Sequence, residues 1–326
     1  MYLVGLTNLV ALFTMLCVAV NGPAKMSGTA LPATLTTLNL PCWLDWLATD
    51  ALLADPRYTP EVWRLTSKNV NDFKRKAALH PGKLWLFWNE PEHTDQANMP
   101  PEIAASLTIS YTQVLAENGT WACCGNLIDG NGLAWLDSYL AHGGPLPNVW
   151  HIHIYGATDQ DEWNAYLNYW WAWWKQHGAG KPVIISETSL MWQPAAKQAA
   201  LLRDLLRYDD KNVQQIYWFS AFYEPSVPSW SESRLLNNDL TKTELGKIYA
   251  PDLLATATDT ATPTVTITDT PIGQAMTPTP LSSPTATPTP PVSITATPAP
   301  TETGDAPVGT SLTYKLYLPL CESSHD

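Results

Sequence analysis

The sequence predicts an α/β protein whose folded part is a (β/α)8 barrel of the TIM type. Short apolar runs end near residues 90, 126, 155, 187 and 220, and a helical pattern lies between each pair. The intervals of 29 to 36 residues match one strand, one helix and two short loops. An open doubly wound sheet shares this alternation, but no glycine-rich phosphate loop follows any strand, which disfavours the nucleotide-binding sheet.

Each predicted strand is a short run of aromatic, aliphatic or β-branched residues. In chain order the strands cover residues 38–43, 58–65, 83–90, 120–126, 148–156, 181–189 and 215–223. The predicted helices cover residues 71–79, 102–118, 133–142, 161–177 and 193–208. If the strand that ends at Glu90 is the fourth, one strand–helix unit is missing or degenerate. We therefore expect a barrel that is trimmed in its N-terminal quarter.

Composition divides the 326 residues into four parts. Residues 1–22 are mostly apolar and are expected to be a signal peptide or an N-terminal anchor, although no positive residue precedes the apolar run. Residues 36–252 hold all 16 tryptophans and form the predicted barrel. Residues 253–309 are rich in Thr and Pro and are predicted to be a disordered linker. Residues 310–326 form a short apolar tail, either inert or associated with the cell surface.

The charge of the chain excludes one class of partner. The formal net charge is −12, and the 18 Lys and Arg residues form no long basic run, so no nucleic acid partner is expected, because phosphate binding needs clustered basic residues. Acidity fits a protein that acts on a neutral polymer outside the cell or on its surface, and it fits equally well a charge that only maintains solubility.

Four cysteines lie outside the N-terminal segment: Cys42, Cys123, Cys124 and Cys321. They form no C-x-x-C pair, so a structural zinc site is disfavoured. An oxidising compartment would permit a disulfide between Cys42 and either Cys123 or Cys124, and buried free thiols are the favoured alternative.

Two strands end in a glutamate. Asn89-Glu90-Pro91 follows the buried run from residue 83, and Glu187 closes the run from residue 181. Polar groups at the carboxyl ends of barrel strands lie where such folds build active sites. Two carboxyl groups there are what glycoside hydrolysis requires. The alternative is that Asn89-Glu90-Pro91 only caps the following helix, with Glu90 facing solvent.

These motifs resemble clan A of the glycoside hydrolases. Within it, the chain is most similar to family 128, the β-1,3-glucanase-like group with an alkali-sensitive-linkage-type glycosyl hydrolase catalytic domain. The resemblance rests on marks spread over residues 40 to 250: Trp43-x-x-Trp46, Pro60-Glu61-Val62-Trp63, Phe87 to Glu92, His153-Ile154-Tyr155, Ile185 to Thr188 and Trp218. One departure is Glu61, which replaces an apolar residue that is usual after Pro60.

The resemblance implies a retaining mechanism with Glu90 as acid/base and Glu187 as nucleophile. Asn89 would then donate to the sugar 2-hydroxyl, and Tyr155 would hydrogen-bond Glu187 and hold it ionised, while His153 lines the same face. His151 and His153 lack a third ligand at a sensible spacing, so no metal is expected, and no cofactor is predicted.

Tryptophans near strand ends are candidate platforms for sugar rings, because flat aromatic faces stack on pyranoses. Trp43, Trp88 and Trp218 are the three candidates. A second set lies on the predicted helix over 161–177, where packing against the barrel is expected. Its members are Trp163, Trp170, Trp171, Trp173 and Trp174.

The sequence thus predicts a monomeric glycoside hydrolase, secreted or held at the cell surface, that cleaves a β-glucan, in particular β-1,3-glucan. A non-catalytic polysaccharide-binding surface protein is the alternative from another class, although such a protein has no need of paired carboxylates. A transglycosylase would use the same residues, because water access at the acceptor side distinguishes transfer from hydrolysis.

Overall fold

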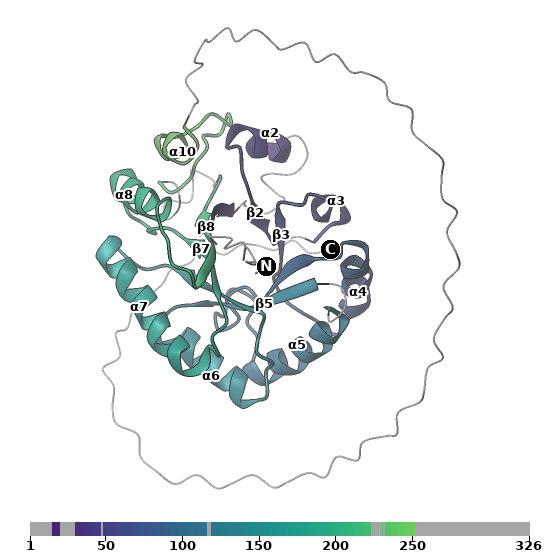
Figure 1. The fold of residues 1–326 in the computed structure, drawn as a ribbon. Coiled ribbons are helices and arrows are strands. Elements are labelled where there is room, and N and C mark those ends of the chain that lie inside the picture. Colours follow the sequence, from purple (N-terminus) through teal and green to yellow (C-terminus); the bar gives the residue numbers. More distant parts are fainter. Residues whose placement is uncertain are drawn as a thin grey trace, which may run out of the picture. The chain divides into compact units, whose positions relative to one another are not determined.

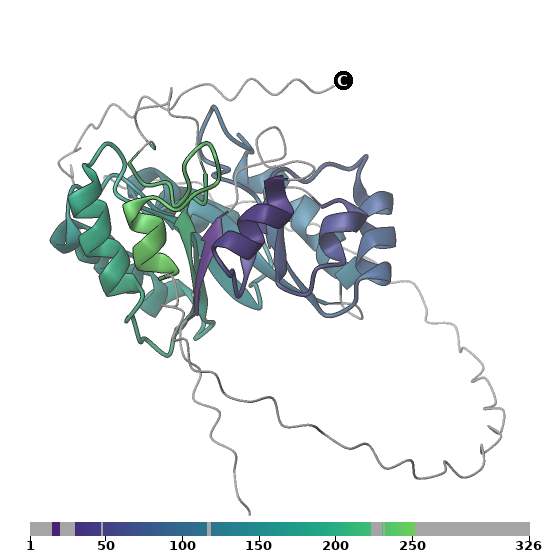
Figure 2. The ribbon, with the colours of Figure 1, turned by 90° about the horizontal axis from the view of Figure 1, so that it is seen from above.

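The computed structural model describes residues 15–19, 30–46, 48–115, 119–222, 230 and 232–251. Within them, eight parallel strands form a closed barrel in the order in which they occur along the chain. Helices lie on the outside of the strands (Figures 1 and 2). The predicted (β/α)8 fold is confirmed.

The strands are short and deeply buried. Their bounds are β1 Met15–Ala19, β2 Trp43–Asp45, β3 Tyr58–Val62, β4 Lys83–Phe87, β5 Gly119–Leu127, β6 Val149–Ile154, β7 Val183–Thr188 and β8 Val213–Phe219. Each strand pairs with its neighbours in parallel, and β1 pairs with both β8 and β2, which closes the sheet. Closure leaves no edge strand, so the ladder hydrogen bonds are satisfied on both sides of every strand.

The helices follow the strands in alternation. Their bounds are α2 Ala30–Thr37, α3 Asp50–Leu53, α4 Val70–Leu79, α5 Pro101–Leu115, α6 Gly130–Ala141, α7 Gln160–His177, α8 Ala195–Leu205 and α10 Glu244–Tyr249. Several begin at side-chain caps: Asp129 accepts from the amide of Gly132, and Asp159 accepts from that of Glu162. All five predicted helices are present, with ends that differ by a few residues.

The N-terminal quarter differs from the prediction. The first strand is β1, which lies inside the segment expected to be a signal peptide or anchor, and α2 follows it. The barrel is therefore complete rather than trimmed, and it begins before residue 36. A signal peptide cut after residue 22 would remove a strand that β8 and β2 both need. Among the described residues, no helix is long and apolar enough to cross a bilayer.

The cysteine prediction is also wrong. Cys17 on β1 forms a disulfide with Cys42, which lies just before β2, and their Cα atoms are 5.1 Å apart. Val18 of β1 pairs with Trp43 of β2. The residues directly before them, Cys17 and Cys42, therefore lie side by side. Cys123 and Cys124 form a disulfide with each other on β5. Cys321, the predicted linker and the predicted tail lie outside the described residues.

Candidate active site

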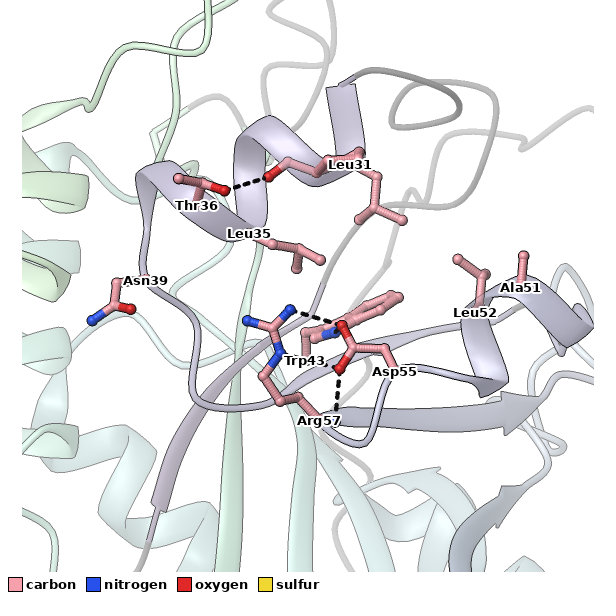
Figure 3. A pocket seen from close by; sticks show the side chains of 10 residues that line it. Leu31, Leu35, Thr36, Asn39, Trp43, Ala51, Leu52, Asp55 and Arg57 are labelled. Carbon is pink, nitrogen blue, oxygen red and sulfur yellow. Dashed lines mark hydrogen bonds and ion pairs between the residues drawn. The ribbon is translucent and has the colours of Figure 1, made fainter. Parts of the chain in front are cut away.

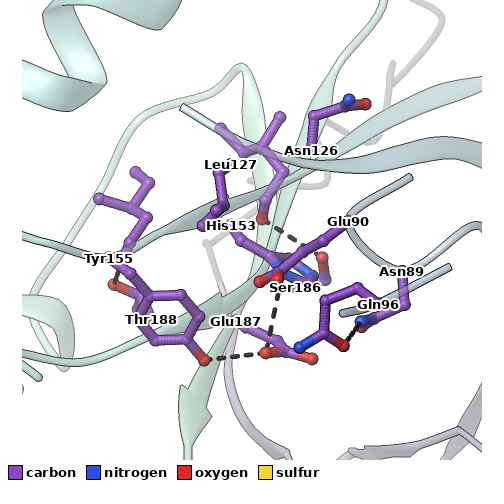
Figure 4. Close-up of polar contacts among 12 residues, drawn as sticks. Asn89, Glu90, Gln96, Asn126, Leu127, His153, Tyr155, Ser186, Glu187 and Thr188 are labelled. Atoms are coloured by element: carbon purple, nitrogen blue, oxygen red, sulfur yellow. Dashed lines mark hydrogen bonds and ion pairs between the residues drawn. The ribbon is translucent and has the colours of Figure 1, made fainter. Parts of the chain in front are cut away.

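The two predicted catalytic glutamates lie at the same end of the barrel. Glu90 follows β4, and Glu187 is the penultimate residue of β7. Because all eight strands are parallel, their carboxyl ends meet on one face, where both side chains point inward (Figure 4). Each glutamate is only 5% exposed. Helix α5 begins at Pro101, ten residues after Pro91, so the alternative in which Glu90 faces solvent beside a helix cap is wrong.

The backbone that carries Glu90 is held in an uncommon conformation. Trp88 and Glu90 have φ angles of 72° and 44°, in the left-handed region that non-glycine residues seldom adopt. The amide of Glu90 donates to the carbonyl of Gly125 on β5 at 3.0 Å. Gly125 itself has φ +64°, and a Cβ there would lie 2.4 Å from the carbonyl oxygen of Trp88. Neighbouring strands thus fix a strained turn that aims the carboxyl group inward.

Glu187 receives two hydrogen bonds. Tyr155 donates its hydroxyl to Oε2 at 2.9 Å, and Trp46 donates its indole N–H to Oε1 at 3.1 Å. Burial raises the pKa of Glu187 to about 7, while these two donors act in the opposite direction. The predicted contact between Tyr155 and Glu187 is therefore present.

Glu90 lies beside a histidine. Nδ1 of His153 is 2.9 Å from Oε1 of Glu90 and 3.7 Å from Oε2 of Glu187. Burial, with a contribution from the charge of Asp129, raises the pKa of Glu90 to about 8. Oε2 of Glu90 has no hydrogen-bond partner among the described residues. Burial thus raises the pKa of both glutamates, and the Tyr155 and Trp46 donors favour the ionised form of Glu187.

The two carboxyl groups are close. One carboxylate oxygen of Glu90 and one of Glu187 lie within 4.8 Å of each other and of a ring nitrogen of His153. In inverting glycosidases the carboxyl groups are about 6.5–9.5 Å apart, because a water molecule must fit between base and sugar, whereas retaining enzymes hold them at about 5–5.5 Å. The observed approach favours the shorter arrangement.

Asn89 is tied to the same cluster. Its Oδ1 accepts from the indole of Trp46 at 3.0 Å, and its Nδ2 donates to Gln96 at 3.0 Å. The amide group carries two N–H donors, so one remains to be directed toward a ligand. The structure thus brings together Asn89, Glu90, His153, Tyr155 and Glu187, as the sequence predicted.

Sequence reasoning missed Trp46 and Gln96. The indole N–H of Trp46 lies within hydrogen-bond distance of both Asn89 and Glu187. A signal was available, because Trp46 comes directly after β2, at the same end of the barrel as the glutamates. Gln96 lies in the loop between β4 and α5, where no pattern distinguishes it from other polar loop residues.

The prediction that three tryptophans are sugar platforms is wrong. Trp43, Trp88 and Trp218 are at most 1% exposed, so their faces cannot stack on a ligand. Their indole N–H groups donate to Asp55, to Thr108 and to the carbonyl of Ser233, respectively. Trp43 also lies beside a pocket between α2 and α3, next to the Asp55–Arg57 ion pair (Figure 3), and Glu90 is not among the residues that line this pocket. Core packing competes with display for large aromatic residues, and here packing is what the structure contains.

The tryptophans of α7 pack as expected. Trp163, Trp170 and Trp173 are buried, and Trp171 and Trp174 are half-buried. Trp150 on β6 contacts Trp170 and Trp173, with ring centroids 6.2 and 5.3 Å apart. These residues join the helix to the barrel rather than line the site.

Two sets of three side chains place potential metal ligands within 4.8 Å of one another. They are Glu90, His153 and Glu187, and Glu61, His151 and His153. In the first set, Nδ1 of His153 is hydrogen-bonded to Oε1 of Glu90, and Oε2 of Glu187 accepts from the hydroxyl of Tyr155. In the second, both nitrogens of His151 are in hydrogen bonds, to Phe87 and Ser186. The expectation of a metal-free site stays a prediction.

A closed parallel barrel with a close pair of carboxyl groups at the carboxyl ends of β4 and β7 defines the class of barrel glycoside hydrolases. The chain belongs to the glycosyl hydrolase catalytic core family, whose family model matches residues 38–249. The resemblance inferred from the sequence motifs is confirmed. No curated protein matches the chain.

The solved structures that are similar to this chain include β-1,3-glucanases of glycoside hydrolase family 128. A subgroup II endo-β-1,3-glucanase from Pseudomonas viridiflava is 24% identical, with a TM-score of 0.55 over 74% of this chain and 98% of its own. A subgroup VI exo-β-1,3-glucanase from Aureobasidium namibiae is 21% identical, with a TM-score of 0.58 over 74% and 97%. A subgroup I endo-β-1,3-glucanase from Amycolatopsis mediterranei, in complex with laminaritriose, is 20% identical, with a TM-score of 0.54 over 73% and 98%. At these identities the likeness shows a shared fold.

Proposed function

We propose that this protein hydrolyses β-1,3-glucan by a retaining, double-displacement mechanism, with Glu90 as acid/base and Glu187 as nucleophile. The observation that carries the proposal is the approach of the two carboxyl groups to within 4.8 Å. The choice of β-1,3-glucan is supported by the fold shared with endo- and exo-β-1,3-glucanases, one of them in complex with laminaritriose.

In the first step, protonated Glu90 gives its proton to the glycosidic oxygen. The ionised carboxylate of Glu187 attacks the anomeric carbon, so that the bond to the leaving sugar breaks as a glycosyl–enzyme ester forms. The hydrogen bonds suit these roles, since Glu187 accepts from two donors that favour its ionised form, while burial raises the pKa of both glutamates. Oε2 of Glu90 is the oxygen free to carry the transferred proton.

In the second step, Glu90 acts as a base. Its carboxylate takes a proton from water as the water oxygen attacks the anomeric carbon, and Glu187 leaves as a carboxylate. Tyr155 and Trp46 stabilise the carboxylate that departs, because both donate to it. The remaining N–H of Asn89 donates to the sugar 2-hydroxyl, a contact that strengthens in the transition state.

Action outside the cytoplasm is part of the proposal. Its support is the Cys17–Cys42 disulfide, because disulfides persist in oxidising compartments. A large polymeric substrate is also reached more readily there.

The decisive experiment measures reducing-sugar release by the full chain on β-1,3-, β-1,4- and mixed-linkage glucans, mannan and xylan. Activity on β-1,3-glucan should fall by at least about 10³-fold in Glu187→Gln, because a covalent nucleophile is lost. Glu102→Gln, an exposed change on α5, is the matched control and should retain full activity.

Product stereochemistry tests the mechanism separately. NMR of the first-formed reducing ends should show the β-anomer, as double displacement retains configuration. The α-anomer would establish inversion and refute the assigned roles. Binding of glucan without cleavage would support the polysaccharide-binding alternative, and longer products formed with added acceptor sugars would support transglycosylation.

A further inference from the structure

A third buried glutamate lies in the barrel interior, and the proposed reaction steps do not use it. Glu61 is on β3, and its side chain is fully buried. Neither carboxylate oxygen has a hydrogen-bond partner among the described residues. A buried polar group without a partner costs about 1–3 kcal/mol, so a native protein seldom retains one that does nothing.

The neighbours of Glu61 are the two histidines of β6. A carboxylate oxygen of Glu61 and ring nitrogens of His151 and His153 lie within 4.8 Å of one another. His151 has no nitrogen to spare, because Nε2 lies 2.8 Å from the carbonyl of Phe87 and Nδ1 lies 3.0 Å from the hydroxyl of Ser186. Since a carbonyl only accepts, Nε2 of His151 carries its proton and Nδ1 accepts from Ser186.

His153 is in a different state. Its Nδ1 is occupied by Glu90 at 2.9 Å, while its Nε2 is buried and has no partner among the described residues. Two buried groups without a hydrogen-bond partner among the described residues, the Glu61 carboxyl and Nε2 of His153, therefore belong to one cluster. On the far side of the same imidazole ring is the acid/base Glu90.

We propose that Glu61 is a positioning residue that fixes the tautomer of His153. Rotation of the Glu61 carboxyl from its position in the structure, where it makes no hydrogen bond, lets the protonated group donate to Nε2, so the ring proton lies on Nδ1 and is donated to Oε1 of Glu90. The proton stays on Glu61, and no covalent bond forms or breaks. The inference deepens the proposed function and rests on the role of Glu90 as acid/base.

The surroundings keep Glu61 protonated. Desolvation raises its pKa well above the usual value, and the charges of Glu187, Glu90 and Asp45 add to the effect. The titratable groups that face it come from every neighbouring part of the barrel: Asp45 on β2, Glu90 after β4, His151 and His153 on β6, Glu187 on β7 and Tyr217 on β8. None of them is a lysine or arginine, and burial lowers the pKa of both histidines.

Donation from the Glu61 carboxyl to His153 is favoured over acceptance by Glu61 of a hydrogen bond from His153. If Nε2 of His153 carried the proton and donated to Glu61, the carboxyl O–H of Glu61 would stay buried and unpaired. Orphaned donors are rarer than under-satisfied carbonyl oxygens in folded proteins. With the proton on Nδ1, His153 stabilises the Glu90 carboxylate that forms when the leaving sugar departs, and it offsets part of the rise in pKa caused by burial.

The test compares two variants of the full chain, Glu61→Gln and Glu61→Met. Long-range ¹⁵N–¹H NMR reads which ring nitrogen of His153 is protonated, with His153→Asn used only to assign the signal. Wild type and Glu61→Gln should show the proton on Nδ1, because an amide N–H can replace the carboxyl donor. Glu61→Met should move the proton to Nε2. In that variant the alkaline limb of the pH profile of kcat/KM on β-1,3-glucan should move to higher pH by on the order of one pH unit. The reason is that Glu90 then donates to His153, which raises the pKa of Glu90.

Each contrary result overturns the proposal. A proton on Nε2 in wild type does so even if neither variant folds. An unchanged tautomer in Glu61→Met does so as well, and so do equal shifts of the alkaline limb in both variants, which would mean that only the charge of Glu61 matters. The NMR measurement needs no substrate, so an absence of glucanase activity would refute the proposed function without touching this result.

Discussion

The hydroxyl of Tyr155 donates to Oε2 of Glu187 across 2.9 Å, from the residue that directly follows β6. The two side chains come from neighbouring strands, since β6 pairs with β7 in parallel. This contact stabilises the ionised form of a carboxyl group that is otherwise raised in pKa by burial. The hydrogen bond therefore lowers the pH at which Glu187, the proposed nucleophile, ionises.

Replacing Tyr155 by Phe should shift one limb of the pH profile. The proposed mechanism requires ionised Glu187 and protonated Glu90, so kcat/KM should be highest between pH about 7 and about 8. Without the hydroxyl the carboxylate loses a donor, the pKa of Glu187 rises, and the acid limb should move upward by roughly one pH unit. The measurement is kcat/KM against pH on β-1,3-glucan.

Tyr169→Phe, an exposed change on α7, is the control for Tyr155→Phe and should leave both limbs in place. A shift of the alkaline limb alone would mean that Tyr155 acts on Glu90, contrary to the assigned roles.

The strand ends were predictable because buried parallel strands are continuous apolar runs, and the run before Glu90 and the run ending at Glu187 have no competing interpretation. The first strand could not be predicted from the sequence. Met15–Ala19 lies within one long apolar stretch, and a strand there has the same composition as the core of a signal peptide. Only its pairing with β8 and β2 distinguishes the two, and pairing is a property of the tertiary structure.

The aromatic residues show a second limit. The predicted strand ended at Trp43, but β2 runs to Asp45, so Trp46 rather than Trp43 reaches the catalytic face. A shift of a few residues in a strand end changes which side chain points into the site. Glu61 is a related case, because a glutamate in a strand gives no indication of whether it faces solvent or the barrel interior.

Deletion of residues 1–22 should prevent formation of the closed barrel. The deletion removes β1 and Cys17, so β8 and β2 lose their shared neighbour and Cys42 loses its disulfide partner. Two unpaired sheet edges would then be exposed, which favours aggregation. Residues 23–326 should be insoluble when expressed, or, if soluble, should lack the near-UV circular dichroism signal of packed aromatic side chains. Deletion of residues 1–14, which leaves β1 intact, is the control; equal stability of both forms would contradict the role of β1.

Replacing Gly125 by Ala should disrupt the turn that carries Glu90. The added Cβ would lie 2.4 Å from the carbonyl of Trp88 and 2.9 Å from Cε1 of His151, in a backbone conformation that only glycine adopts readily. We expect a loss of stability of more than about 2 kcal/mol by urea denaturation, together with lost activity. Gly180→Ala is the matched control, since Gly180 has φ +68° but open space around its Cβ position. Equal losses in the two variants would show that backbone strain, and not the clash, causes the effect.

Trp192 takes the place of the buried tryptophans as a candidate sugar platform. It is 57% exposed, lies four residues after β7 and has φ 64°. Loops after barrel strands surround the active site, so its face is available to a bound glucan. Trp192→Ala should raise KM for long β-1,3-glucans about 5- to 30-fold, which corresponds to about one to two kcal/mol of stacking, with little change in kcat. Tyr169→Ala on α7 should leave KM unchanged; a fall in kcat without a change in KM would assign Trp192 to the chemical step instead.

The buried carboxyl group of Glu61 also leads to a prediction about stability. The pKa of Glu61 in the folded protein is raised well above its value in the unfolded chain. Between these two pKa values the folded protein binds a proton that the unfolded chain has lost, so the free energy of unfolding falls as pH rises. The slope from this one group is at most about 1.4 kcal/mol per pH unit. Below pH about 4.5 the carboxyl is protonated in both states and the contribution is constant. Glu61→Gln has no proton to lose, so its stability relative to wild type should rise steadily from pH 5 to pH 8.

Urea denaturation at each half pH unit measures this difference, with Glu102→Gln as the exposed control that should stay parallel to wild type. If the Glu61→Gln curve also stays parallel to wild type, then Glu61 titrates alike in the folded and unfolded states. The carboxyl would then be ionised in the folded protein at neutral pH, and a donor to His153 would be lost with it.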